Sequence, residues 1–343
     1  ARPLSLDSAD FDKDGMADIA SGYGGPNGGI ITLHRGSVDA PFLKHAAVFA
    51  LPEPADFIGA GDFDADGNLD VVSAARGGSK LYVSAGDGSG GITTVREIGL
   101  PGRVTALRVG EINRADGLED IVVGITGEAG AKALVFEGPE GALRASPETF
   151  ELRAEVSGFA IGQIDEQREY DLLVAAGREL VVIAGRDRKL SLNKTERAQV
   201  KAAQVVKSEL GFGIRGIEVG DFTGRRRIDV ALLSDRGEVV ILSEEKSGKP
   251  ILRLDMWKQE RLRGGGQRMV KAGVSAQVAD ELLVTDGNRL RVITHTRREA
   301  EQEQGGETFI TAEEGRREEV SFEVDGEAVA AIGAQAAGRS TTP

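Results

Sequence analysis

The stretch Asp62-Phe63-Asp64-Ala65-Asp66-Gly67-Asn68-Leu69-Asp70 is followed directly by Val71-Val72 and has a close counterpart near the start of the chain. The counterpart reads Asp10-Phe11-Asp12-Lys13-Asp14-Gly15-Met16-Ala17-Asp18 and is followed by Ile19-Ala20. In both stretches aspartate occupies positions 1, 3, 5 and 9 and glycine occupies position 6. An aspartate before a run of aliphatic residues then recurs, at intervals of 50 to 58 residues, at Asp18, Asp70, Asp120, Asp171, Asp229 and Asp280. Such a period predicts a repeat architecture.

Each repeat holds about four strand-like runs separated by turn residues. In the second repeat the runs are Phe57–Gly61, Leu69–Ala74, Lys80–Ser84 and Ile92–Ile98, and glycines such as Gly77-Gly78 stand between them. Four antiparallel strands in every repeat of this length are typical of a propeller blade. One blade cannot bury both of its faces, so neighbouring blades must stack in a ring. The sequence therefore predicts an all-β fold, a single β-propeller domain of four-stranded antiparallel blades.

The predicted blade count is seven, from six repeats and the start of another. Residues 330–334 resemble a strand that enters a further unit, as residues 218–221 enter the fifth. A closed ring of six blades is the alternative. The predicted blades cover residues 4–52, 53–103, 104–155, 156–211, 212–269 and 270–326, with a partial blade at 327–343.

Composition narrows the classes of function. The 343 residues carry a net charge of −13, and no stripe of basic residues with interleaved aromatic residues is present, which argues against nucleic acid as a partner. There is no cysteine, so disulfides and thiolate metal sites are excluded. No apolar run approaches the length of a membrane-spanning helix, and we therefore expect no membrane insertion.

The two acidic loops predict two calcium sites. Ca²⁺ binds six to eight oxygen atoms, and alternating aspartates on a tight turn direct their carboxylates to one point. The predicted ligands are the four aspartates of each loop and the main-chain carbonyl of position 7, namely Asp10, Asp12, Asp14, Met16 and Asp18 in the first loop and Asp62, Asp64, Asp66, Asn68 and Asp70 in the second. Phe11 and Phe63 are expected to face the packing between blades. An EF-hand is disfavoured, because strand-like runs flank the loops and position 12 lacks the bidentate glutamate.

The later loops depart from this pattern. The third keeps Glu111, Asn113, Asp116 and Asp120 but has one inserted residue. The fourth replaces the turn glycine with Arg168, and the fifth places Thr223, Arg225 and Arg227 between Asp221 and Asp229. An arginine guanidinium in the fifth loop can pair with both carboxylates in place of an ion. The sixth loop, around residues 275–280, is too short to enclose a metal.

The loop pattern, with Gly61 before it and aliphatic residues after it, resembles the FG-GAP or VCBS repeat. That repeat forms the N-terminal propeller of integrin α-chains and occurs in many bacterial cell-surface and secreted proteins. The resemblance covers most of the chain and is clearest over residues 4–125. It implies a seven-bladed propeller, calcium in the loop between the first two strands of a blade, and an extracytoplasmic location. Because the family is functionally broad, the fold alone does not fix the function.

Two functions from different classes fit these features. The first is a calcium-binding, non-catalytic interaction or structural module of a secreted or cell-surface protein, with a protein or glycan partner. The second is a polysaccharide lyase or hydrolase that uses the central funnel of the propeller. His34, His45 and His295 stand at unrelated phases of the repeat, and no catalytic constellation is visible, so the sequence favours a protein that is not an enzyme.

Overall fold

The chain is described from a computed structural model. The described residues are 1–38, 45–138, 140–144, 146–165, 167–244, 254–261, 268–274, 279–286, 289–294, 298–304, 307–313 and 319–323.

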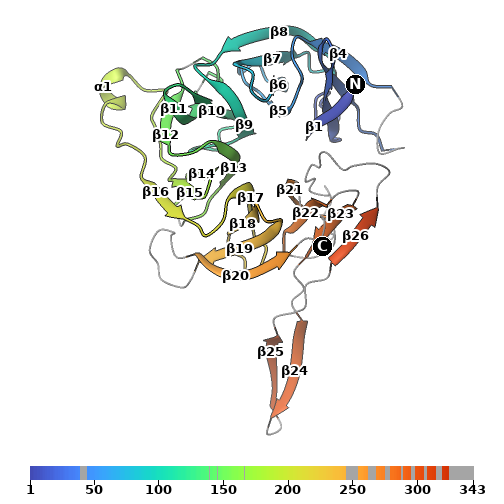
Figure 1. Cartoon of the computed structure of the whole chain (residues 1–343), viewed down its shortest axis with the longest axis vertical. Coiled ribbons are helices and arrows are strands. Elements are labelled where there is room, and N and C mark those ends of the chain that lie inside the picture. The colour runs from blue at the N-terminus through green and yellow to red at the C-terminus, as the bar shows by residue number, and fades with distance from the viewer. Residues whose placement is uncertain are drawn as a thin grey trace.

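Six four-stranded antiparallel sheets make up the ring, and in the first five the four strands are consecutive in the chain. Figure 1 shows the sheets arranged as blades around a centre, with the first strand of each blade innermost. The inner strands are β1 (Arg2–Ala9), β5 (Phe57–Gly61), β9 (Arg103–Gly110), β13 (Val156–Gly162), β17 (Ile214–Gly220) and β21 (Arg268–Ala272). The second strands are β2 (Asp18–Gly25), β6 (Asp70–Ala74), β10 (Asp120–Gly127), β14 (Asp171–Ala176), β18 (Asp229–Ser234) and β22 (Glu281–Asp286).

The third strand of each blade pairs with the second, and the fourth lies at the rim (Figure 1). The third strands are β3 (Gly28–His34), β7 (Lys80–Gly86), β11 (Gly130–Phe136), β15 (Glu179–Ile183), β19 (Glu238–Glu244) and β23 (Arg289–Ile293). The outer strands are β4 (Ala47–Leu51), β8 (Ile92–Gly99), β12 (Glu148–Leu152), β16 (Val205–Glu209), β20 (Leu254–Arg261) and β26 (Glu319–Glu323). The predicted all-β propeller with four-stranded antiparallel blades is confirmed.

The blade count differs from the prediction. The described residues form six blades, not seven. The partial seventh unit was predicted at 327–343, which lies outside the described residues. The first six repeats each supply a complete sheet, so the described residues have the number of blades given by the sixfold alternative.

The hydrophobic core lies between neighbouring blades. Phe11 packs with Val71 and Tyr82 between the first and second blades, and Phe63 packs with Ile121 and Val123 between the second and third. Both phenylalanines are buried, as their position between alternating aspartates predicts. Because the side chains of a strand alternate between its two faces, each blade buries one face against each neighbour.

Two insertions leave the plain blade pattern. The short helix α1 (Lys194–Arg197) lies in the connection between β15 and β16, with Asn193 as its N-cap. The hairpin of β24 (Arg298–Gln304) and β25 (Glu307–Glu313) lies between β23 and β26 and extends away from the ring (Figure 1). Among the described residues, no helix has the length and apolar character needed to cross a membrane.

Candidate metal-binding loops

Every blade begins its second strand with a buried carboxylate. In the first five blades this residue is the recurrent aspartate, and in the sixth it is Glu281, each at most 3% exposed: Asp18, Asp70, Asp120, Asp171, Asp229 and Glu281. The repeat pattern of the sequence predicted Asp280 at this position, which is wrong by one residue. Glu281 accepts the Val274 amide at 2.7 Å, seven residues earlier in the chain, as Asp18 accepts the Phe11 amide at 2.9 Å.

These carboxylates fasten the loop to the strand that follows it. In the fourth blade one oxygen of Asp171 accepts the Ile164 amide at 3.0 Å, and the other accepts the Gly185 amide at 2.8 Å, just after the third strand. Asp18 accepts the equivalent two amides, those of Phe11 and Gly36, and Asp70 accepts those of Phe63 and Gly86. The aspartate therefore has a structural role in each of these blades, with or without a metal motif.

Burial raises the pKa of these carboxyl groups. It raises the pKa of Asp70 and of Asp171 to about 6, against two amide hydrogen bonds that lower it. In the third blade burial, reinforced by the charge of Glu137, raises the pKa of Asp120 to about 9. The free acid is therefore favoured at Asp120 near neutral pH.

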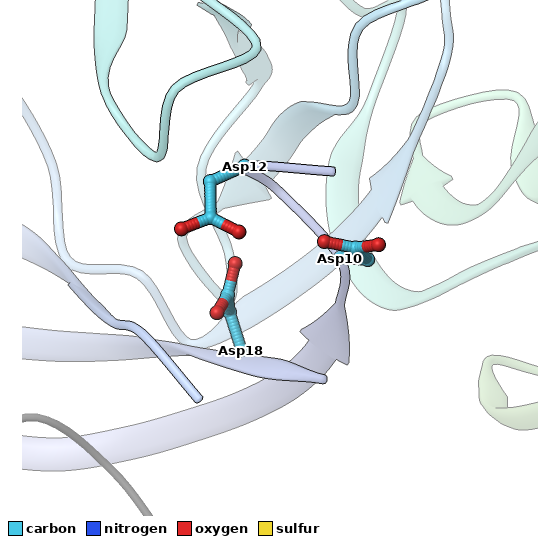
Figure 2. Close-up of side chains that lie close together, drawn as sticks. All are labelled: Asp10, Asp12 and Asp18. Atoms are coloured by element: carbon cyan, nitrogen blue, oxygen red, sulfur yellow. The ribbon is translucent and has the colours of Figure 1, made fainter. Parts of the chain in front are cut away.

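The first loop brings three of its carboxylates together. Oxygen atoms of Asp10, Asp12 and Asp18 lie within 4.8 Å of one another (Figure 2). The turn is held from inside, because the two oxygens of Asp10 accept the amides of Asp14 at 3.0 Å and Gly15 at 2.9 Å. Gly15 has φ +85°, a left-handed conformation that position 6 of the loop requires.

Asp12 is the residue whose surroundings point to a cation. Its side chain is 7% exposed, and its Oδ1 is buried without a hydrogen-bond partner. Its Oδ2 lies 2.6 Å from Nε of Arg35. A buried carboxylate oxygen without a partner is costly, and a hard cation satisfies it. The donor set of the first loop therefore fits Ca²⁺.

The second loop repeats this arrangement. Oxygens of Asp62, Asp64 and Asp70 lie within 4.8 Å of one another, and Asp62 accepts the amides of Asp66 at 3.2 Å and Gly67 at 2.8 Å. Gly67 has φ +82°. Asp64 is exposed, whereas Asp62 and Asp70 are buried. The carboxylate set of the second loop also fits a hard cation.

The remaining predicted ligands lie outside these clusters. Asp14 Oδ1 accepts the Met16 amide at 2.8 Å, and Asp66 Oδ1 accepts the Asn68 amide at 2.7 Å. Asn68 also links the two loops, because its Oδ1 accepts a hydrogen bond from Lys13 Nζ at 2.7 Å. Position 5 of each loop thus stabilises the turn in this structure.

The third loop is occupied by protein contacts. Asn113, 4% exposed, forms a backbone bridge with Tyr170 of the fourth blade, and its Oδ1 accepts the Arg186 amide at 3.0 Å. Its Nδ2 donates to Glu137 at 2.7 Å, and Glu137 pairs with Arg188 at 2.8 Å. An arginine of the fourth blade therefore lies beside the acidic loop of the third blade, a contact that the sequence pattern did not predict.

In the fifth loop main-chain amides hold the first aspartate. Asp221 accepts the amides of Arg225 at 2.9 Å and Arg226 at 2.7 Å, as Asp10 accepts those of Asp14 and Gly15. In the fourth loop Gln163 replaces the first aspartate and donates to the Arg168 carbonyl. Among the described residues, the grouped carboxylates with metal-binding geometry belong to the first and second loops.

The centre of the ring forms a second feature, which sequence reasoning missed. A cavity of about 360 Å³ is lined from five inner strands by residues that include Asp7, Arg108, Glu218, Arg268 and Lys271. Arg108 and Glu218 form a two-pronged ion pair, with Nη1–Oε1 3.2 Å and Nη2–Oε2 3.4 Å. Asp7 accepts the amides of Ala60 at 2.8 Å and Ser8 at 2.9 Å. These charged residues come from strands far apart in the sequence, so no local motif predicts that they meet.

Comparisons with known proteins agree with this fold. The four-stranded blades arranged around a centre define a β-propeller. Residues 62–123, from the second acidic loop to the second strand of the third blade, match the family model described as FG-GAP-like repeat. A search of curated proteins found no match.

Two solved structures share the fold. One is a crystal structure of BBS1N in complex with ARL6DN, soaked with lead, with a TM-score of 0.56 and 15% identity over 85% of this chain and 78% of that chain. The other is the same complex soaked with mercury, with a TM-score of 0.57 and 14% identity over 85% of this chain and 77% of that chain. At this identity the similarity shows the architecture only.

Proposed function

We propose that the protein is a calcium-binding, non-catalytic interaction module. The observation that carries the calcium assignment is the buried Oδ1 of Asp12, which has no hydrogen-bond partner and belongs to a group of three converging carboxylates. Asp10, Asp12 and Asp18 would hold one ion, and Asp62, Asp64 and Asp70 a second. Bound calcium would neutralise these carboxylates, and an ion that binds only the folded state stabilises it by mass action.

The partner we propose is a protein, with a glycan as the alternative ligand. The support is the propeller fold with FG-GAP-like repeats and the printed description of the two similar structures, both of which are complexes with ARL6DN. In this chain the loops at the ends of the strands are the parts free to vary, because the blade cores are packed against each other.

The contacts in the central cavity support the non-catalytic part of the proposal. Glu218 is paired with Arg108, and Asp7 is bonded to two main-chain amides. We take carboxylates held in this way to serve packing and charge balance. Turnover of a polysaccharide that is lost in Glu218→Gln or Asp7→Asn would favour the enzyme alternative instead.

We also propose an extracytoplasmic location. Each loop brings together three carboxylates and lacks the bidentate glutamate of high-affinity loops, which suits the millimolar calcium outside the cytoplasm. Localisation of a full-length reporter fusion by fractionation tests this point, and recovery in the cytoplasm alone would contradict it.

The calcium assignment is tested by isothermal titration of EDTA-treated protein. We expect two bound ions and a higher melting temperature with calcium. Asp12→Asn and Asp64→Asn should each remove one ion, whereas Asp165→Asn, at a half-buried position of the fourth loop, should remove none. No heat of binding at millimolar calcium would refute the assignment.

The interaction assignment needs a separate measurement. The calcium-loaded protein, immobilised, is exposed to a cell-envelope extract and to a glycan array, with the EDTA-treated protein as control. Calcium-dependent capture of one defined ligand is the expected result. Two empty screens would count against an interaction module.

A further inference from the structure

The first and second acidic loops share their carboxylate pattern but differ at one neighbouring position. Gly36 donates its amide to Asp18, and Gly86 donates its amide to Asp70, so the two glycines are equivalent. The residue before Gly36 is Arg35, whereas the residue before Gly86 is Ala85. Only the first of these two loops therefore has an arginine at this place.

Arg35 already occupies one of the first loop's carboxylates. Its Nε lies 2.6 Å from Oδ2 of Asp12, whose side chain is 7% exposed. Its Nη2 donates to the Ser89 carbonyl of the second blade at 3.0 Å. The turn that carries Ser89 packs closely here, because the Gly90 amide donates to the Phe11 carbonyl at 3.2 Å and a Cβ on Gly90 would lie 2.9 Å from Arg35 Nε.

A guanidinium and a divalent cation at the same buried carboxylate repel each other. The repulsion between charges a few ångströms apart is strong where water is largely excluded. An ion in the first loop must therefore displace Arg35 from Asp12 or bind beside it at reduced affinity. At the equivalent place the second loop has the uncharged Ala85, and the nearby Lys13 donates to the Asn68 side-chain oxygen rather than to one of the grouped carboxylates.

We propose that Arg35 is an intramolecular competitor for the cation of the first loop. The two loops then bind Ca²⁺ with unequal affinity, the second more tightly, although their ligand patterns match. Displacement of Arg35 also releases its hydrogen bond to Ser89, so that binding in the first blade is communicated to the second. This inference rests on the proposed calcium function.

The test isolates the first site. In an Asp64→Asn background, which removes the second site, calcium titrations compare Arg35 with Arg35→Ala and with Arg35→Gln. Both substitutions should tighten calcium binding by about tenfold, and Arg35→Gln keeps a side chain that can reach Ser89. Arg96→Ala, on the exposed strand β8, removes the same charge elsewhere and should leave the affinity unchanged.

The outcomes separate the inference from the calcium assignment. Unchanged or weaker calcium binding in both Arg35 variants, with one ion still bound, overturns the inference and leaves the calcium assignment intact. Absence of calcium binding in the unmodified protein and in every variant overturns both. Circular dichroism and thermal melting without calcium establish whether each variant is folded. If Arg35→Ala is unfolded, Arg35→Gln is used for the test.

Discussion

Glu119 of the third blade accepts a hydrogen bond from the Asp62 amide of the second blade, with Oε2 and N 3.0 Å apart. The fifth and sixth blades repeat the contact, because Asp280 Oδ2 accepts the Asp221 amide at 2.9 Å. Each acceptor directly precedes the buried carboxylate of its own blade, and each donor is the first residue of an acidic loop. The contact also explains the glycine before each donor: a Cβ at Gly61 would lie 2.6 Å from Cβ of Glu119, and one at Gly220 would lie 2.6 Å from Oδ2 of Asp280.

We predict that Glu119→Ala lowers both stability and calcium affinity at the second loop. The Asp62 amide loses its partner, a loss of about 1–3 kcal/mol, and the loop loses its anchor on the next blade. Glu119→Gln keeps an acceptor and should lose less. Urea unfolding and calcium titration measure the two effects, and Glu128→Ala, exposed in the same blade, is the control. Equal behaviour of all three variants would refute the role of this contact.

Asp171 should stabilise its blade independently of calcium. Asp171→Asn can satisfy only one of the amides of Ile164 and Gly185, so the free energy of unfolding should fall by about 1–3 kcal/mol. The fall should be the same in calcium and in EDTA. Asp187→Asn, on the surface of the same blade, should have little effect. A loss for Asp171→Asn that disappears in EDTA would show that the aspartate acts through a metal.

The pH dependence of the same variant follows from the raised pKa. Burial raises the pKa of Asp171 to about 6 in the folded protein, so this group favours the folded state below its unfolded value of 3.8, and the contribution is lost as the pH rises to about 6. Asparagine does not ionise. The stability difference between the unmodified protein and Asp171→Asn should therefore widen as the pH is lowered from 7 to 4, in EDTA. A difference that narrows would contradict the assigned direction.

Removal of one partner of the central ion pair should lower the free energy of unfolding, whereas replacement of both partners should restore most of it. Arg108→Met leaves Glu218, 4% exposed at its side chain, without its partner, and because the Arg108 side chain is itself 42% exposed we expect a loss of about 1–3 kcal/mol. Burial already raises the pKa of Glu218, and removal of Arg108 should raise it further. The double variant Arg108→Met, Glu218→Leu should regain most of the loss. Urea unfolding of the four proteins in this cycle measures the coupling, and additive losses would refute it.

The fold could be predicted from the sequence because the acidic loops and strand-like runs that indicate it are local and recur along the chain. In the second blade the predicted run Lys80–Ser84 became the strand Lys80–Gly86, and the run Ile92–Ile98 became Ile92–Gly99. In the sixth blade the pattern predicted Asp280 as the buried carboxylate, but Glu281 takes that place. Glu281 has one more methylene than aspartate and accepts the equivalent loop amide, so a search for aspartate alone gives the wrong residue. The prediction of seven blades depended on the strand-like run at residues 330–334, and a single strand is not a four-stranded blade.

The central cavity could not be predicted from the sequence, because the residues that line it are far apart in the chain. Arg108 and Glu218 are separated by 110 positions, and only the curvature of the ring brings them together. The grouping of Asp10, Asp12 and Asp18 could be predicted because nine residues of one loop determine it. The engagement of Asp12 by Arg35 could not, because it depends on where the third strand of the blade ends.

The buried carboxylate at the start of each second strand has a consequence for the evolution of such a ring. Since Asp171 and Asp229 hold their blades without a full set of acidic neighbours, a blade can lose the carboxylates at loop positions 1, 3 and 5 and still keep its shape. The reverse path is equally short, because the aspartate that completes a cation site is already in place before the site exists. The metal binding proposed for the first and second loops would thus be a trait that individual blades gain or lose by a few substitutions while the ring persists.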